Sequence, residues 1–376
     1  VHLSSVHNGF DPRIFYKECK SLAEYGYNIK LVIPFEKSEE LKLEGIYIIP
    51  LRKPNNRLYR IVKTINQVRK IALNINGDLY HFHDPELIPV GLFLKMKGKK
   101  VIYDIHEDYL TSIQQKQYLG IFRFPISWLF FLFEKISSNF LELVLAEKYY
   151  SNRFPRGTVV CNYPILSKIK QYQEDTILKS KINKYASNSV KLIYTGNVTE
   201  CRGALIQASI INLLKNIELY FVGRCQVDIA EKIRDIANKS VNKVHIIGEN
   251  SYVNYETILE FYTSFSWTAA LAIFPSTPHY KQKELTKIFE YMAFGIPVIC
   301  SNFPVWKTLV EDNGVGLSVD PQSENSIVKA VTYLKDNPNE AKEMGNRGKN
   351  LVYNQYNWES ESKKLLQLYQ NILESH

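Results

Sequence analysis

Short apolar runs alternate with amphipathic stretches along most of the chain. The strand-like runs of the first half are 29–34, 46–50, 78–83, 99–104, 141–146 and 158–161. A second series covers 190–194, 217–222, 244–247, 269–274, 297–300 and 316–319. Helix-like stretches, such as 13–24 and a basic one around 57–75, lie between the runs of the first half. Strands that alternate with helices predict parallel α/β sheets.

The alternation stops around Pro164, and residues 165–188 are rich in Lys, Gln, Ser and Asn, as is typical of an exposed connector. A chain of 376 residues is long enough for two domains of common size. We therefore expect two doubly wound α/β domains, at 1–165 and 166–355, and a helix at 356–376 that packs back toward the first. Ligands of such sheets bind outside the carboxyl ends of the strands, and two facing domains form a cleft.

Composition narrows the function classes. Hydrophobic residues are 45% and charged residues 23%, which excludes a collagen, a coiled coil and a long disordered chain. Lys and Arg exceed Asp and Glu by 47 to 38, and the net charge of +9 favours phosphates, nucleic acid or an anionic membrane face. The cysteines, at 19, 161, 201, 225 and 300, are widely scattered, so we expect free thiols in a reducing compartment. The N-terminal residues lack a signal-peptide pattern, and we expect a cytoplasmic protein.

One aromatic stretch stands out. No run reaches the ~18–20 apolar residues that a membrane span needs, and the nearest, 126–133, is followed at once by Glu134 and Lys135. Two interpretations stay open for it. It is a buried helix, or it is an interfacial helix on an anionic leaflet, assisted by Lys116 and Arg123.

The stretch 287–299 carries the strongest chemical signal. A helix that ends at Gly295 and a strand that begins at Pro297 are explained by ordinary capping. A lysine at the start of a helix opposes the helix dipole, unless it binds an anion together with the free amides. Glu290 lies on the same face as Lys287, at i+3. The two form a surface ion pair, or Lys287 binds a diphosphate and Glu290 a ribose.

Several segments in order resemble one known family. They are 287–297, 301–306, 316–321 and 356–359 in the second half, and 11–15, 83–87 and 103–108 in the first. They are similar to segments of the retaining, sugar-nucleotide-dependent glycosyltransferases of the GT-B fold, family four, and the match runs over most of the chain. The resemblance implies two Rossmann-like domains that face each other across a cleft.

The resemblance also implies a donor site in the second domain. Arg202, which follows the strand ending at Gly196, and Lys287 hold the donor diphosphate from two sides. Two fixed cations and helix amides stabilise the charge that develops on a departing diphosphate. The chain has no Asp-x-Asp motif, so we expect no metal and no cofactor other than the donor. Further donor contacts are expected from Gly9, Gly196, Glu249, Gln282 and Glu290.

One position departs from the family pattern. Many members carry a glutamate eight residues before the one at Glu290, where this chain has Gln282, and Glu284 is out of register. A glutamine side chain still exchanges hydrogen bonds with a sugar hydroxyl, but it supplies no carboxylate. The sugar preference stays open for this reason.

In the first domain, His106 ends a strand, and the resemblance implies that it binds a donor-sugar hydroxyl or positions the acceptor. It places His83, Asp84 and Glu86 on the acceptor side. His81 and His83 point to one face of a strand, as metal ligands would. A metal-dependent hydrolase is disfavoured, because the downstream histidines at 106, 245 and 279 have no ligand spacing.

The sequence therefore favours a retaining transferase. It would move a sugar from a UDP- or GDP-sugar to a hydroxyl of a glycan or lipid-linked glycan in cell-surface polysaccharide synthesis, with no nucleic-acid partner. Basic residues at 57, 60, 63, 69 and 70, together with the aromatic stretch, suggest that the acceptor is attached to a lipid carrier at the inner membrane face. The alternatives are a GT-B sugar-nucleotide epimerase and a non-catalytic regulatory subunit that binds a nucleotide sugar.

Overall fold

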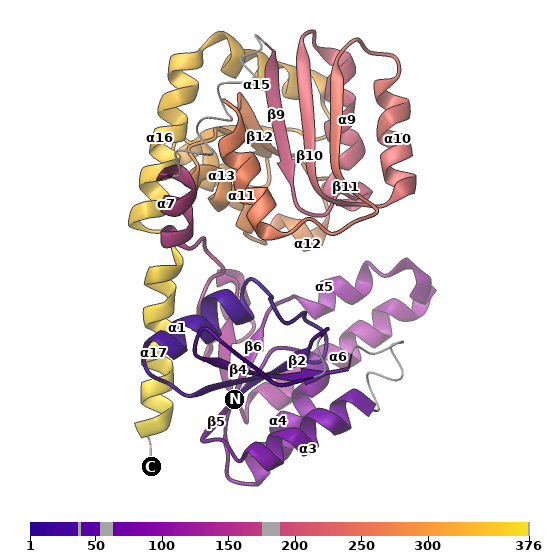
Figure 1. Ribbon diagram of the computed structural model, residues 1–376. Helices are drawn as coiled ribbons and strands as arrows, with labels where there is room; N and C mark the ends of the chain where they lie inside the picture. Colours follow the sequence, from indigo (N-terminus) through magenta and orange to yellow (C-terminus); the bar gives the residue numbers. More distant parts are fainter. Residues whose placement is uncertain (37–38, 53–62, 175–188, 375–376) are drawn as a thin grey trace. The chain divides into compact units, whose positions relative to one another are not determined.

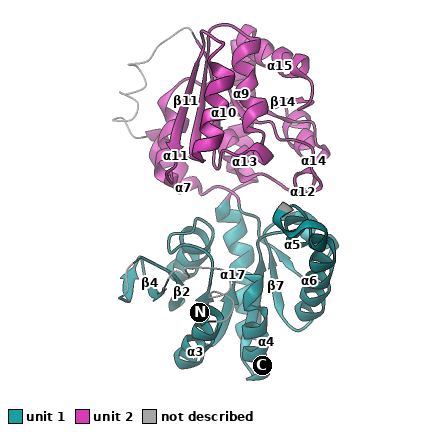
Figure 2. Cartoon of the chain, turned by 90° about the vertical axis from the view of Figure 1, so that its right-hand side faces the viewer, with its two compact units in different colours: residues 1–162, 358–376 teal, residues 163–357 magenta. Residues whose placement is uncertain are grey.

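Two largely parallel sheets form the cores of two units (Figure 2). The computed structural model describes residues 1–36, 39–52, 63–174 and 189–374 (Figure 1). Unit 1 comprises Val1–Asn162 and Trp358–His376, and unit 2 comprises Tyr163–Asn357. The expected α/β class, with two doubly wound sheets, is confirmed.

The sheet of unit 1 has the order β3-β4-β2-β1-β5-β6-β7-β8. Every pairing in it is parallel except that of β3 with β4. Because the order reverses beside β1 and β5, the carboxyl ends of these two strands form the switch point at which such sheets bind ligands. The strands are β1 (His2–Leu3), β2 (Ile29–Pro34), β3 (Leu41–Leu43), β4 (Ile46–Leu51), β5 (Leu79–Phe82), β6 (Lys100–Ile105), β7 (Glu142–Leu145) and β8 (Thr158–Val159).

Apolar side chains of the strands and of the helices packed on them fill the core of unit 1. The rings of Phe82 and Tyr103, from neighbouring strands, stack with centroids 4.7 Å apart. Strands buried on both faces read as nearly continuous apolar runs, which is why the sequence indicates them clearly. The helices are η1 (Ile14–Cys19), α1 (Lys20–Glu24), α3 (Ile65–Ile75), η3 (Pro85–Leu87), α4 (Ile88–Met96), α5 (Tyr109–Gln114), η4 (Gln117–Phe122), α6 (Arg123–Ser138), η5 (Lys148–Asn152) and α17 (Trp358–Glu374).

The C-terminal helix α17 is part of unit 1, where it packs against η1 and β8. The indole nitrogen of Trp358 donates to Ser21 Oγ at 2.8 Å, and Glu361 accepts from the main-chain N–H of Cys161 at 2.8 Å. The expected basic helix is described only in its second half, as α3. Arg57 and Arg60 lie outside the described residues.

The sheet of unit 2 has the order β11-β10-β9-β12-β13-β14, and all its pairings are parallel. Its switch point lies at the carboxyl ends of β9 and β12. Right-handed crossovers that lead outward from this point in opposite directions place their helices on opposite faces of the sheet. The strands are β9 (Val190–Thr195), β10 (Ile217–Cys225), β11 (Lys243–Glu249), β12 (Ala269–Ala272), β13 (Val298–Ser301) and β14 (Gly316–Val319).

Helices α9 and α10 pack together, as do α13 and α16 (Figure 1). The helices of unit 2 are α7 (Leu166–Glu174), η7 (Glu200–Arg202), α9 (Ala204–Leu213), α10 (Val227–Ala237), α11 (Tyr255–Ser264), α12 (Pro278–Lys281), α13 (Thr286–Ala293), α14 (Pro304–Lys307), η8 (Thr308–Asp312), α15 (Glu324–Asp336) and α16 (Pro338–Asn354).

The prediction of an exposed connector over 165–188 is wrong in its first part. Residues 166–174 form helix α7, which packs on α11 and buries Ile169. The polar composition of the segment conceals its apolar residues, and Gln173 Nε2 of the same helix also donates to the main-chain oxygen of Ala293 at 3.1 Å. Residues 175–188 lie outside the described part of the chain.

The five cysteines are free thiols, as expected. Among the described residues, no helix combines the length and the apolar character that crossing a bilayer requires.

Candidate active site

Two cations lie at the switch point of unit 2. Arg202 is the last residue of η7, which follows β9, and Lys287 stands in the first turn of α13, which follows β12. Strands β9 and β12 are hydrogen-bonded neighbours. Both cations therefore come from segments that leave the carboxyl edge of the sheet where doubly wound folds bind ligands.

The ammonium group of Lys287 is held inside this edge. Its Nζ donates to the main-chain oxygen of Thr195 at 2.6 Å and lies 3.7 Å from the ring centroid of Tyr194. Burial, and next the charge of Arg202, lower the pKa of Lys287 well below its ordinary value. The attraction of Glu290 opposes this shift but does not outweigh it. A bound anion would relieve the repulsion between the two cations.

The guanidinium of Arg202 is held by an aromatic neighbour, because it hydrogen-bonds to the hydroxyl of Tyr280. The chain passes the ammonium of Lys287 at Gly196, directly after β9. Gly196 has φ +89°, and a Cβ there would lie 3.7 Å from Lys287 Nζ. Glycine adopts this backbone conformation without strain and leaves the space beside the ammonium open.

The carboxylate of Glu290 lies one helical turn after Lys287 and is held by tyrosines. It accepts a hydrogen bond from the hydroxyl of Tyr262 at 2.9 Å and another from Tyr255. Tyr262 also bonds to Thr195 Oγ1 at 2.8 Å, at the end of β9. The geometry thus brings Gly196, Arg202, Lys287 and Glu290 to one edge of the sheet.

The other residues assigned to the donor have different surroundings. Gln282 is exposed, directly after α12. Glu249 ends the edge strand β11 and forms an ion pair with Arg234. Gly9 belongs to unit 1, where a Cβ would overlap the ring of Phe35 at 2.0 Å, so close packing accounts for this glycine. The nearby Glu284 accepts a hydrogen bond from the hydroxyl of Tyr163 at 3.0 Å.

In unit 1, Asp84 and Glu86 hold the loop that follows β1. Asp84 Oδ2 accepts from Ser4 Oγ at 2.8 Å and from the N–H of Ser5 at 2.7 Å, and Glu86 accepts from Ser5 Oγ at 2.8 Å. Both carboxylates therefore fix the backbone at the switch point of this sheet.

His106 is anchored by a buried carboxylate. Its Nε2 lies 2.5 Å from Asp104 Oδ2, and only about 10% of its side chain is exposed. Arg13 binds both oxygens of Asp104, with Nε and Nη2 each at 3.0 Å. Burial alone would raise the pKa of Asp104, but Arg13 and His106 outweigh it and hold that pKa well below its ordinary value. An ionised Asp104 thus fixes the orientation of the His106 ring.

A second histidine network continues from Asp104 into the core. His83 Nδ1 lies 3.2 Å from Asp104 Oδ2, and His83 Nε2 lies 3.0 Å from His2 Nδ1. The hydroxyl of Tyr369 then joins His2 Nε2 at 3.0 Å to His81 Nδ1 at 2.8 Å. Burial lowers the pKa of the three histidines, which are neutral. The ionised Asp104 only accepts hydrogen bonds, so His83 carries its proton on Nδ1 and accepts at Nε2 from His2 Nδ1. The same reasoning, continued through the hydroxyl of Tyr369, leaves one tautomer for His2 and one for His81.

Glu18 Oε2 also lies 3.9 Å from the Nδ1 atoms of His81 and His83. The sequence patterns did not indicate His2, Glu18 or Tyr369 as members of this network. Tyr369 lies on α17, at the other end of the chain from His2. Contacts between residues so distant in sequence leave no local spacing that could reveal them.

Two groups of side chains in the network have donor atoms within 4.8 Å of one another, as a metal site would require. One is His2, Glu18, His81 and His83, and the other is Glu18, His83, Asp104 and His106. Arg13 Nε lies 2.9 Å from Glu18 Oε1, so the guanidinium of Arg13 already pairs with the carboxyl groups of Glu18 and Asp104. Burial, and next the charge of Asp104, raise the pKa of Glu18 well above its ordinary value, which favours a neutral carboxyl.

His7 is a further residue that the patterns did not single out. Its Nδ1 lies 2.9 Å from Asp11 Oδ2, and its ring centroid lies 5.2 Å from that of His106. Burial would lower the pKa of His7, but the carboxylates of Asp11 and Asp84 prevail and raise it to about 9. A charged imidazolium therefore stands beside His106 at neutral pH.

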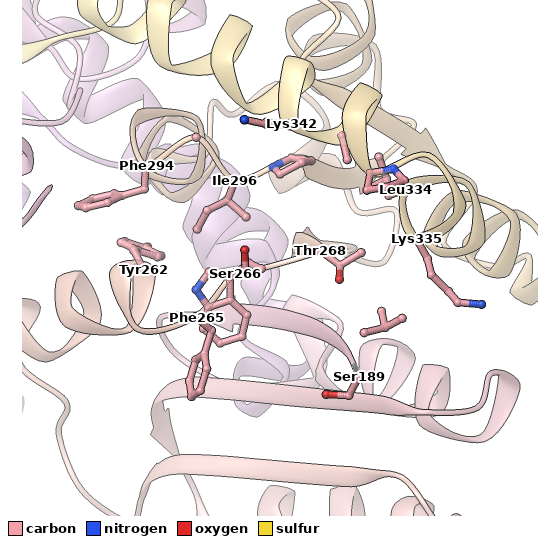
Figure 3. Close-up of a pocket in the computed structure, with 16 residues that line it drawn as sticks. Ser189, Tyr262, Phe265, Ser266, Thr268, Phe294, Ile296, Leu334, Lys335 and Lys342 are labelled. Atoms are coloured by element: carbon pink, nitrogen blue, oxygen red, sulfur yellow. The ribbon is translucent and has the colours of Figure 1, made fainter. Parts of the chain in front are cut away.

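Two pockets lie elsewhere than at Arg202 and Lys287. One of about 620 Å³ opens where β9, β12 and β13 begin, at the opposite edge of the sheet of unit 2 (Figure 3). Tyr262 and Phe294 lie side by side at one end of it, and Lys335 lies toward the other. The second, about 720 Å³, lies in unit 1 and is lined by residues that include Tyr47 and Ile71. Neither is lined by Arg202 or Lys287.

Family models match most of the chain. Residues 179–351 match the model described as "Glycosyl transferases group 1", and residues 3–139 match "Glycosyl transferase 4-like". The chain belongs to the group 1 glycosyltransferases. The two matches fall on unit 2 and unit 1, and the first includes both Arg202 and Lys287.

Solved structures show the same fold at low sequence identity. Sucrose-phosphate synthase (tll1590) from Thermosynechococcus elongatus has a TM-score of 0.76 at 17% identity, over 95% of this chain and 92% of that one. A glycosyltransferase from Rickettsia africae ESF-5 has a TM-score of 0.71 at 16% identity, and the match covers 100% of this chain and 98% of that one. Anabaena Alr3699/HepE, in complex with UDP-glucose, has a TM-score of 0.69 at 10% identity, and the match covers 98% of this chain and 97% of that one. The fold of this glycosyltransferase is GT-B, as expected. A search of the curated proteins found no match.

Proposed function

We propose that this glycosyltransferase moves a sugar, with retention of anomeric configuration, from a nucleoside diphosphate sugar to a hydroxyl of a glycan or lipid-linked glycan. The pairing of Arg202 with Lys287 at the switch point of unit 2 carries the proposal. The similar HepE of Anabaena was solved with UDP-glucose, which supports a UDP-linked donor and leaves a GDP-linked donor to be tested.

In the proposed step, the bond between the anomeric carbon and the diphosphate oxygen breaks. The acceptor oxygen bonds to the same face of that carbon, and its proton passes to an oxygen of the departing diphosphate. The enzyme then needs no covalent nucleophile. Arg202, Lys287 and the free amides at the start of α13 stabilise the negative charge that the diphosphate gains.

Lys287 has a particular part in this charge balance. Burial and Arg202 favour its neutral form in the unliganded protein. A diphosphate between the two side chains reverses the sign of the local field, so the ammonium form becomes favourable. Donor binding and proton uptake by Lys287 are therefore coupled in this proposal.

The remaining site residues take supporting roles. Glu290, held by Tyr262, accepts hydrogen bonds from the ribose hydroxyls, and the exposed Gln282 contacts a hydroxyl of the transferred sugar. His106, fixed by Asp104, binds a donor-sugar hydroxyl or positions the acceptor.

We further propose that transfer is independent of metal ions, because the two cations supply the charge that a divalent ion supplies in other transferases. Full activity of the purified enzyme in a chelator would support this. Loss of activity that added Mg²⁺ or Mn²⁺ restores would overturn it. The proposed setting is the cytoplasmic side of the membrane, in the synthesis of a cell-surface polysaccharide.

The purified protein incubated with UDP- and GDP-sugars and with glycan acceptors tests the function. Release of nucleoside diphosphate together with a new α-glycoside from an α-linked donor is expected. Formation of an epimeric sugar nucleotide would instead indicate an isomerase, and binding without turnover a regulatory subunit. For Arg202→Ala and Lys287→Ala we expect turnover to fall at least ~10²-fold, the scale of removing one charge-stabilising donor.

A further inference from the structure

Helix α6 buries four polar side chains and exposes most of its large apolar ones. The buried residues on it are Ser127, Glu134, Ser137 and Ser138. The large apolar side chains on its outer side are 42–69% exposed, namely Phe124, Ile126, Trp128, Leu129, Leu132, Phe133 and Ile136. A surface helix of a water-soluble domain normally shows the reverse arrangement.

Specific polar contacts attach this helix to unit 1. Ser127 Oγ accepts from Gln114 Nε2 of α5 at 3.1 Å, and Glu134 accepts from the hydroxyl of Tyr103 on β6 at 2.7 Å. The guanidinium of Arg156 donates to the main-chain oxygen of Ser138 at 3.2 Å. The orientation of α6 is therefore fixed by hydrogen bonds that would be lost if its apolar face turned inward.

The apolar face continues on both sides of α6. Tyr118, Ile121 and Phe122 of η4 are 66–79% exposed, and Phe140 is 60% exposed. We refer to residues 118–140 as the apolar hairpin. An exposed apolar surface of this extent marks an interaction site on a folded protein.

The charges of this region have one sign. Glu134 is the single acidic residue between 109 and 141. It is buried, and burial raises its pKa to about 7, so it adds little negative charge to the surface. Lys116, Arg123 and Lys135 supply positive charge at or next to the hairpin, and the Arg123 guanidinium lies 4.9 Å from the ring centroid of Phe124.

We propose that the apolar hairpin inserts into the interfacial layer of an anionic lipid bilayer. Trp, Tyr and Phe side chains prefer the depth of the lipid headgroups, and basic residues are attracted by anionic lipids. The combination of exposed aromatic rings with cations and no exposed carboxylate favours this occupant over a second copy of the chain, whose hairpin would carry the same positive charge. The inference goes beyond the transfer reaction and does not depend on the identity of the donor.

The protein contains its own probe for this insertion. Trp128 on α6 is 57% exposed, whereas the other tryptophans, at 267, 306 and 358, are at most 9% exposed. With vesicles of phosphatidylcholine and phosphatidylglycerol we expect the full-length protein to co-sediment, and the Trp128 emission to shift to the blue and to be quenched by brominated lipid. Trp128→Phe should keep the binding and lose most of both optical signals.

Leu129→Ser/Leu132→Ser is the decisive variant, since both residues are exposed and their replacement leaves the core intact. Loss of two inserted leucines should weaken vesicle binding about tenfold or more. Val241→Ser, at an exposed apolar residue of unit 2, is the matched control and should bind as the unmodified chain does. Salt should weaken the binding of all three proteins.

Three results would overturn the proposal. They are no binding to anionic vesicles at low salt, equal binding to pure phosphatidylcholine vesicles, and a stable dimer in solution that shields Trp128 and binds no lipid. The third would identify a second copy as the occupant. None of these results bears on sugar transfer, which is measured with a water-soluble acceptor.

Discussion

Burial, and next the charge of Arg202, lower the pKa of Lys287, although the two residues come from different helices of unit 2. The charge of Arg202 disfavours the ammonium form of Lys287, and a bound anion would relieve this repulsion. This relationship is the physical basis for placing the donor diphosphate between them.

Replacing Lys287 by methionine should stabilise the unliganded protein. Because the pKa of Lys287 is lowered in the folded state, the unfolded chain binds more protons below its own pKa of about 10.4, and the native state is penalised there. The penalty shrinks as pH rises toward that value. Lys287→Met should therefore raise the melting temperature by a few degrees at pH 7, and by less at pH 9.

Thermal unfolding with and without UDP measures both effects. The variant should also lose the stabilisation that UDP gives to the unmodified protein. Lys281→Met, which removes an exposed cation of α12, is the control and should change neither quantity. A destabilised Lys287→Met variant that retains the UDP effect would contradict the assignment.

Donor binding should be accompanied by proton uptake. The pKa of Lys287 is lowered in the unliganded protein. If the diphosphate binds beside Lys287 as proposed, it raises this pKa, so the protonated protein should bind UDP more tightly and the affinity for UDP should fall as pH rises. Calorimetric titrations in buffers of different ionisation enthalpy measure the number of protons taken up. We expect a positive number for the unmodified protein at pH 8 and a number near zero for Lys287→Met.

The His7–Asp11 pair should stabilise unit 1 in a defined pH range. The pKa of His7 is raised to about 9, so its contribution is complete below about pH 6.5 and is lost as pH rises through 9. The shift corresponds to at most about 3 kcal/mol. Urea unfolding should show His7→Gln to be destabilised at pH 6 and almost unchanged at pH 10. An equal difference at both pH values would show that His7 acts through packing alone.

Asp104→Asn should destabilise unit 1 and impair transfer. The variant leaves Arg13 without its bidentate partner in the core, and breaking a buried pair costs about 3–5 kcal/mol. It also removes the carboxylate that orients His106. The free energy of unfolding measures the first effect, and turnover at saturating donor the second. The matched control, Asp78→Asn, changes an exposed carboxylate of the same unit, and equal stability of the two variants would contradict this reading.

The sequence predicted the sheets well, because their strands are buried apolar runs. Strand β3 was not predicted, since its three residues are partly exposed and offer no such run. Helix α7 was not predicted either, because its apolar residues are diluted by polar ones. From the sequence, the helix at 126–133 could be buried or exposed. The structure shows that Ser127 and Glu134 are the residues that pack inward, which leaves the large apolar side chains exposed.

The residues of the candidate site also differ in how far the sequence could predict them. Lys287 was indicated by its position at the start of a helix, and Arg202 by the family resemblance. The partners that hold Asp104 and His83 could not be predicted, because Arg13, His2 and Tyr369 come from three distant segments. Local patterns report the elements that carry a site, whereas the hydrogen bonds that orient its side chains depend on the tertiary fold.

Calorimetric titration of UDP into the unmodified protein, Arg202→Ala and Lys287→Ala measures whether these two residues bind the donor diphosphate. Uridine is the ligand that lacks the diphosphate, and Lys239→Ala is the control for an exposed cation of unit 2. If Arg202 and Lys287 bind the diphosphate, the unmodified protein and the control should bind UDP far more tightly than uridine. Each of the two variants should lose at least about tenfold in affinity for UDP, since each removes a charge-assisted contact. Unchanged UDP affinity in both variants would show that these two residues do not bind the diphosphate.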